Sequence, residues 1–147
     1  MKASDIMIKD WLRIQYKDMA GKVIEKTFQV GHIEDYDSFL PDEKGDYYIF
    51  AKGKEHGNMG CIDNMMGVPL TGETLNMNDF DFSDGEYHYY TYQSGEPYIS
   101  IYKSDDGWEC SLTSKYMELK LTLQYVHELQ HALRLCGLDE LADNFKV

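Results

Sequence analysis

The sequence predicts one α+β domain over residues 1–147, with antiparallel strands along most of the chain and one packed helix near its C-terminal end. Three observations favour this class. Short β-rich runs separated by turn residues recur along the chain, and one later stretch has helical periodicity. Hydrophobic residues make up 43% of the 147 residues, which is enough to build a core.

The N-terminal half is predicted to form a β-hairpin or a small open barrel. Residues 11–16 and 23–30 are β-rich runs, and the turn that joins them contains Gly21 near its end. A third strand is predicted over residues 46–52. Residues 53–67 contain four glycines and little periodicity, so they are predicted to form an irregular loop.

The second half is predicted to be a meander followed by a helix. Thr71 is an N-cap candidate for a short helix that continues through Met77. Hairpin-length connections then separate four predicted strands, at residues 86–93, 98–103, 108–113 and 116–121. The packed helix is predicted over residues 122–136, before Gly137, and a further helical turn over residues 138–144.

The charge of the chain limits its partners. It carries 26 acidic and 14 basic residues, a net charge of -12, and residues 31–110 hold 17 of the acidic and 4 of the basic ones. A strongly negative surface disfavours duplex DNA and anionic membranes as partners, since both require a positive field. We interpret these acidic residues, the acidic middle of the chain, in the first place as a solvated surface. The same negative charge would also suit a basic protein partner.

Cysteine use and hydropathy indicate a cytoplasmic protein that does not bind membranes. The three cysteines are odd in number, widely spaced and without a CxxC pair, so a disulfide framework is not expected. Charged residues interrupt the first ten positions, where a signal peptide would need an apolar run, and no stretch approaches the length of a membrane span.

One short motif within the predicted helix suggests chemistry. The run His127-Glu128-Leu129-Gln130-His131 matches the H-E-x-x-H signature of zinc metallopeptidases. Histidines at positions i and i+4 of a helix can bind one zinc ion, and the glutamate can take a proton from the metal-bound water. In a hydrolase, His127 and His131 would therefore be metal ligands and Glu128 the general base.

Two observations disfavour a zinc site. A catalytic zinc needs a third protein ligand, and only Asp139, Glu140 and Asp143 follow the motif as candidates, without an evident spacing. Helical periodicity also places both histidines on the polar side of the helix, which we expect to be solvated. We therefore expect no catalytic residue, no cofactor and no metal, and keep a zinc-dependent metallopeptidase-like hydrolase as the alternative.

Several segments carry a family resemblance: residues 1–12, residues 68–80, the run from Tyr98 to Trp108, Met117-Glu118-Leu119, and the run from Tyr125 to Gly137. In these segments the chain resembles a family of small uncharacterised proteins from gut Bacteroidetes, their mobile elements and crAss-like phages. The resemblance implies that the helix in that family often reads Val-His-x-Leu-Gln-Asn, without the glutamate and the second histidine. A zinc site would then not be the shared function of the family.

Two other patterns have simpler structural interpretations. Residues 78–86 place oxygen side chains as a calcium loop does, but in the wrong register, so an acidic turn before a strand is favoured. The tyrosine-rich run 87–92 favours cross-strand packing over a stacking platform for nucleic acid, because Lys103 is the only base on the neighbouring strands. A neutral sugar would not need such a base.

The sequence thus favours a non-enzymatic cytoplasmic accessory protein that acts through contacts with a protein partner, for which a basic surface would fit the acidic middle. The alternatives are the zinc hydrolase built on His127, Glu128 and His131, and an acidic polyanion mimic that occupies a nucleic-acid-binding protein. The association with phages or mobile elements is implied by the resemblance alone.

Overall fold

The computed structural model describes residues 5–35, 47–53, 59–61, 64–91, 97–114 and 117–147. The chain divides into two compact units, Met1–Val68 and Pro69–Val147. Each unit contains a five-stranded antiparallel sheet, and the α-helices in the described residues belong to the second unit. The predicted α+β class is therefore observed at this coarse level.

The single domain over residues 1–147 stays a prediction, because two compact units can also be the two halves of one domain. The boundary between Val68 and Pro69 falls within the sequence Gly67-Val68-Pro69-Leu70. Flexible linkers are usually rich in polar residues, glycine or serine. The apolar boundary has no such composition, so the sequence carries no linker signal there.

The first unit is an open sheet with the strand order β4-β3-β2-β1-β5. Its strands are β1 (Trp11–Lys17), β2 (Val23–Asp35), β3 (Tyr47–Ala51), β4 (Met59–Cys61) and β5 (Met65–Gly67). The prediction of an irregular loop over residues 53–67 was wrong for β4 and β5. Strands of three residues are too short to show the alternation by which a strand is recognised.

Two residues within the turn between β1 and β2 stabilise it. The carboxylate of Asp18 accepts hydrogen bonds from the amides of Ala20 and Lys22, both at 2.9 Å. Gly21 has a φ of 78°, a left-handed conformation that glycine adopts without steric cost. Asp18 and Gly21 together fix the hairpin register, in which Lys17 pairs with Val23.

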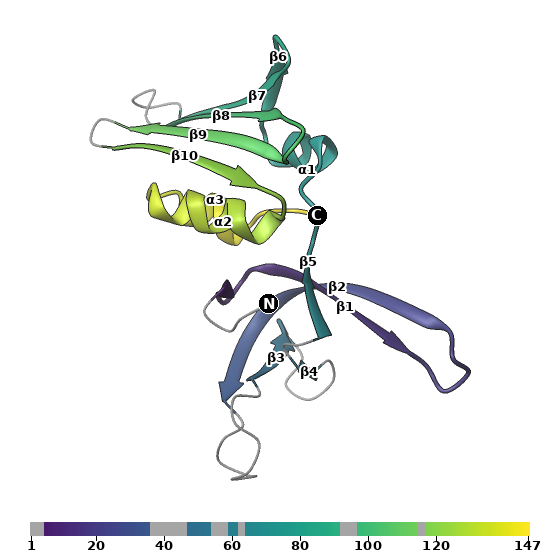
Figure 1. Cartoon of the computed structure of the whole chain (residues 1–147). Helices are drawn as coiled ribbons and strands as arrows, with labels where there is room; N and C mark the ends of the chain where they lie inside the picture. The colour runs from purple at the N-terminus through teal and green to yellow at the C-terminus, as the bar shows by residue number, and fades with distance from the viewer. Residues whose placement is uncertain (1–4, 36–46, 54–58, 62–63, 92–96, 115–116) are drawn as a thin grey trace. The chain divides into compact units, whose positions relative to one another are not determined.

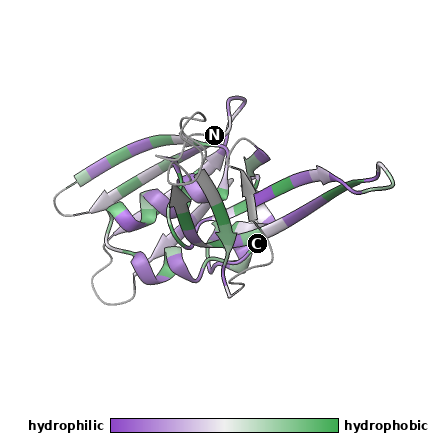
Figure 2. Ribbon diagram, turned by 90° about the horizontal axis from the view of Figure 1, so that it is seen from below, coloured by the Kyte–Doolittle hydropathy of each residue, from purple (hydrophilic) through white to green (hydrophobic). Residues whose placement is uncertain are grey.

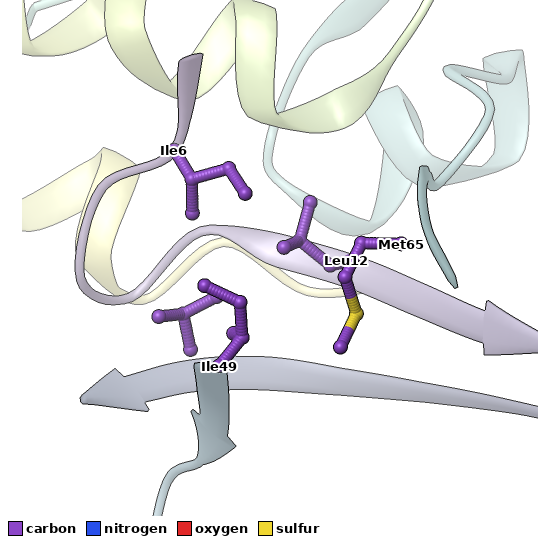
Figure 3. Packing of buried hydrophobic residues seen from close by; sticks show 5 residues of the cluster. Ile6, Leu12, Ile49 and Met65 are labelled. Atoms are coloured by element: carbon purple, nitrogen blue, oxygen red, sulfur yellow. The ribbon is translucent and has the colours of Figure 1, made fainter. Parts of the chain in front are cut away.

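The core of the first unit lies around β1 and β2 (Figure 3). Its buried members are Ile6, Leu12, Val30, Ile49 and Met65, and they come from the N-terminal segment and from four strands. β2 bends beside this core at an irregularity between Val30 and His32. A Cβ on Gly31 would lie 2.7 Å from the Cα of Lys52, so the bend requires glycine.

The second unit is a meander with two helices along one face (Figure 1). The strand order β10-β9-β8-β7-β6 follows the chain. Its elements are α1 (Gly72–Met77), β6 (Asp81–Ser83), β7 (Glu86–Tyr90), β8 (Tyr98–Lys103), β9 (Trp108–Ser114), β10 (Met117–Leu123), α2 (Val126–Leu135) and α3 (Asp139–Asp143). The predicted strand positions Gln93 and Tyr116 lie outside the described residues.

The acidic segment before β7 forms a further strand that the sequence did not indicate. β6 pairs with β7 through Asp81 and His88, Phe82 and Tyr87, and Ser83 and Glu86. Asp84 and Gly85 form the connecting turn with φ values of 53° and 88°. An Asp-Gly pair with two positive φ angles is typical of a tight hairpin turn.

Reciprocal hydrogen bonds at Thr71 begin α1. The Thr71 hydroxyl accepts from the amide of Thr74 at 3.1 Å, and the Thr74 hydroxyl accepts from the amide of Thr71 at 2.9 Å. The N-cap role predicted for Thr71 is confirmed. The partner that closes this capping arrangement is Thr74, whereas Glu73 lies in the first turn, where its charge complements the helix dipole.

α2 begins later than predicted. The prediction began the helix at residue 122, but Thr122 and Leu123 pair with Glu109 and Trp108 as the last residues of β10. Sheet pairing therefore takes precedence over local helical periodicity here. None of the helices in the described ranges is long and apolar enough to cross a membrane.

Alternation along the strands separates two faces of the second sheet, as the alternating hydropathy colours of Figure 2 show. The inner face packs against the buried residues of α2, and Ile99, Ile101 and Leu112 are fully buried on it. Trp108 also lies on the inner face, where its indole nitrogen donates to the carbonyl of Leu70 at 2.8 Å. The opposite face carries the polar residues.

Candidate functional site

The H-E-x-x-H residues lie in the first two turns of α2. The rings of His127 and His131 meet edge to face with centroids 5.9 Å apart, and the ring of His127 stacks on Tyr125 at 5.7 Å. The helix thus brings the two histidines together, as the spacing predicted.

Glu128 caps the helix. One of its carboxylate oxygens accepts hydrogen bonds from the backbone amides of Gln124 at 2.6 Å and Tyr125 at 3.0 Å. These amides precede the first turn of α2, where a carboxylate also complements the positive end of the helix dipole. An oxygen that accepts two backbone hydrogen bonds is directed to its own helix terminus, and a general base must instead reach a metal-bound water.

A catalytic zinc requires a third protein ligand beside the two histidines. Within the described part of the chain, no group of three or more histidine, cysteine, aspartate and glutamate side chains is arranged to hold a metal ion. The described residues include the candidates Asp139, Glu140 and Asp143. Asp143 instead forms an ion pair with Arg134, with 3.3 Å between nitrogen and oxygen.

The predicted solvated position of His127 was wrong, and its neighbour Gln130 is also buried. His127 is 4% exposed and Gln130 is 0% exposed. The side-chain amide of Gln130 donates to the carbonyl of Ala142 in α3 at 2.7 Å. α3 therefore packs on a side of α2 that periodicity alone assigned to solvent.

A second candidate site is the face of the β6–β10 sheet opposite α2, which we call the outer face. The strand registers place alternate residues of all five strands on it. Hydroxyl, carboxylate and aromatic side chains dominate this set. Its members are Asp81, Ser83, Glu86, His88, Tyr90, Tyr98, Ser100, Tyr102, Glu109, Ser111, Thr113, Glu118, Lys120 and Thr122.

Three rings form a cluster on the outer face. His88 stacks on Tyr98 with an interplanar angle of 12°, and its Nδ1 lies 2.8 Å from the Tyr98 hydroxyl. Tyr90 packs beside Tyr98 with ring centroids 5.0 Å apart and remains 54% exposed. Desolvation raises the pKa of Tyr98 above 10.0, and neighbouring Tyr90 raises it further, so the phenol stays protonated at neutral pH.

The inner and outer faces divide the tyrosine-rich run between them. Tyr87 packs against buried Trp108, and Tyr89 against buried Phe80, so these two belong to the inner face. Cross-strand aromatic packing is present on both sides of the sheet. Tyr92 lies outside the described residues.

The outer face is acidic. It carries four carboxylates and one lysine, and Lys120 already pairs with Glu118 at 3.6 Å. Glu109 accepts a hydrogen bond from the Thr122 hydroxyl at 3.1 Å, which orients its carboxylate on the surface. The whole second unit has 14 acidic and 5 basic residues, so it carries nine of the twelve net negative charges.

Comparison with known proteins adds no relative. No protein-family model, no curated protein and no solved structure matches the chain.

Proposed function

We propose that the chain is a non-enzymatic accessory protein that binds a basic protein partner on the outer face of the β6–β10 sheet. The observation that carries this proposal is a broad sheet face, opposite the helices, that presents four carboxylates around a cluster of partly exposed rings. The sequence resemblance supports its place in a phage or mobile element, and the use of cysteine supports its place in the cytoplasm.

The chemistry of the face favours a protein as its partner. Exposed tyrosines offer large, rigid contact areas, and such residues supply much of the binding energy at protein interfaces. Carboxylates beside them attract lysine and arginine side chains and increase the rate of encounter. A nucleic acid would be repelled by the same charges.

The zinc hydrolase finds less support. Its proposed base, Glu128, is held by two backbone amides at the start of α2, and Asp143, a candidate third ligand, pairs with Arg134. The polyanion mimic needs the same acidic surface as our proposal and differs only in the partner's site. It predicts that nucleic acid competes for the partner.

A titration with a basic peptide tests the proposal. The probe is a lysine- and arginine-rich peptide added to the isotopically labelled chain at low ionic strength, followed by amide and tyrosine chemical shifts. We expect shifts concentrated at Tyr90, Tyr102 and Glu109, which reverse as salt screens the carboxylates.

A matched variant identifies the surface. Replacing Glu86 and Glu118 by glutamine removes two charges of the outer face and should weaken peptide binding at least about threefold. Replacing Asp139 and Glu140 by asparagine and glutamine removes two exposed charges at α3 and should leave it unchanged. Equal losses in both variants, or no shifts at all, would refute the proposal.

A further inference from the structure

The far end of the β1–β2 hairpin is an exposed arm. β5 pairs with Leu12–Ile14 and β3 pairs with β2 from Val30 onward. Among the described strands, residues 15–27 therefore pair only within the β1–β2 hairpin, and in Figure 1 this end extends beyond the other strands of the first unit. A two-stranded ribbon is marginal alone in water, so a long one with exposed apolar groups indicates a contact surface.

The arm combines apolar and basic side chains. Met19 at its tip is fully exposed, and Tyr16 and Val23 are 39% and 51% exposed. Three lysines surround them, and all three are exposed: Lys17, Lys22 and Lys26.

The acidic residues of the arm are held locally. Asp18 accepts two backbone hydrogen bonds in the turn. Glu25 forms an ion pair with Arg13, with 3.2 Å between nitrogen and oxygen. The three lysines therefore give the arm a positive field toward solvent.

The outer face of the second sheet complements the arm in charge, chemistry and size. Its four carboxylates match the lysines, and its exposed tyrosines match the apolar tip. Five strands spaced about 4.8 Å apart give a face roughly 20 Å wide, and the arm extends roughly 15 Å beyond the strands that support it. Both surfaces belong to the same chain and are therefore present at equal concentration.

We propose that the arm of one copy binds the outer face of a second copy. The inference rests on the proposed function, because it identifies the arm of a second copy as the basic surface that the outer face binds. The contact joins two different surfaces, so repeated contacts would form rings or open chains of subunits.

Charge reversal provides the test, with sedimentation velocity as the measurement. One variant reverses the arm by Lys17→Glu, Lys22→Glu and Lys26→Glu, and the other reverses the face by Asp81→Lys, Glu86→Lys and Glu118→Lys. We expect the native chain to assemble with concentration at about 0.05 M salt and to dissociate at about 0.5 M. Each variant alone should bind itself at least about tenfold more weakly, and an equal mixture should assemble again.

Folding of the variants is checked by circular dichroism. If the charge-reversed arm fails to fold, Met19→Asp serves as the second arm variant. The Met19 side chain is fully exposed, so its replacement should leave the fold intact and still weaken assembly. A native chain that stays monomeric up to about 300 µM would overturn the proposal, as would a mixture that does not assemble.

Two further outcomes separate this inference from its alternatives. A monomeric native chain that still binds the basic peptide on the outer face would refute self-association and leave the proposed function standing. An arm that binds a single-stranded oligonucleotide, with binding lost on lysine reversal and no self-assembly, would instead identify nucleic acid as the arm's partner.

Discussion

At the scale of single residues, burial on the inner face of the second sheet changes the pKa of the Cys110 thiol. Its side chain is buried on β9, and burial raises its pKa from 9.0 to about 12, with nearby Cys136 as a second cause. Burial also raises the pKa of Cys136. A thiol that stays protonated is a poor nucleophile. Cys110 is therefore an unreactive core side chain at neutral pH, and Cys136 is a half-buried neighbour.

The raised pKa makes stability depend on pH. The folded state retains a proton that the unfolded state releases above pH 9.0, so the contribution of Cys110 is complete below pH 9.0 and is lost as the pH rises toward about 12. Tyr98 acts in the same direction above pH 10.0. Urea unfolding of a Trp11→Phe chain, in which Trp108 is the sole tryptophan, should show the free energy of unfolding fall above pH 9.0.

A variant isolates the thiol in this measurement. Cys110→Ala should lower stability at neutral pH through a small cavity and give a shallower loss between pH 9 and pH 10.5. Identical slopes for the two proteins would contradict the assignment to Cys110.

At the scale of elements, the first turn of α2 depends on one carboxylate. Glu128→Ala leaves the amides of Gln124 and Tyr125 without their acceptor and should lower the free energy of unfolding by about 1 kcal/mol. Glu128→Gln keeps an acceptor oxygen and should lose less than half of that. Glu118→Ala on β10 is the control, because its exposed ion pair with Lys120 contributes little.

Chemical denaturation of the three variants shows whether Glu128 acts as a helix cap or is free for catalysis. A cap predicts the order native, Glu128→Gln, Glu128→Ala in stability. A carboxylate free for catalysis predicts that both substitutions leave stability unchanged or raise it, since catalytic residues are often held at a cost to stability.

The elements of the meander were the most predictable part of this chain. β8 matches its predicted bounds and β9 extends its prediction by one residue, because alternation and Gly-containing turns are local signals. The side of α2 covered by α3 was not predictable, since burial of Gln130 depends on Ala142, twelve residues later. Periodicity reports which face of a helix is apolar and not which polar residues find buried partners.

The same reasoning explains what the sequence indicated about the sites. The spacing of His127 and His131 correctly implied neighbouring rings, but the role of Glu128 depends on where the helix begins. The tyrosine-rich run was visible in sequence. Its division between two faces required the register of β7 with β8, which no local pattern defines.

At the scale of the whole molecule, charge is unevenly divided between the two units. The first unit has 12 acidic and 9 basic residues, and the second has 14 and 5. The basic arm therefore belongs to the less acidic unit and the outer face to the more acidic one. In the proposed self-association, this asymmetry within one chain would let the arm of one copy attract the outer face of another.

The second unit has what it needs to fold alone. Its sheet is a meander of neighbouring strands, and its first and last segments are joined by the side chain of Asn78. That side chain donates to the carbonyl of Lys146 at 2.9 Å and accepts from its amide at 2.8 Å. We expect residues 69–147 to fold as an isolated fragment, with dispersed amide resonances and cooperative urea unfolding.

Asn78→Ala in the fragment tests the reason for this stability. Asn78 is buried, so its loss leaves the backbone groups of Lys146 without their partners and should lower the free energy of unfolding by about 1–3 kcal/mol. Asn76→Ala, at an exposed position of α1, should change it by less than about 0.5 kcal/mol. If the fragment is unfolded while the full chain is folded, the second unit requires the first. If Asn78→Ala and Asn76→Ala lower the free energy of unfolding equally, the link from α1 to the C-terminal segment does not stabilise the unit.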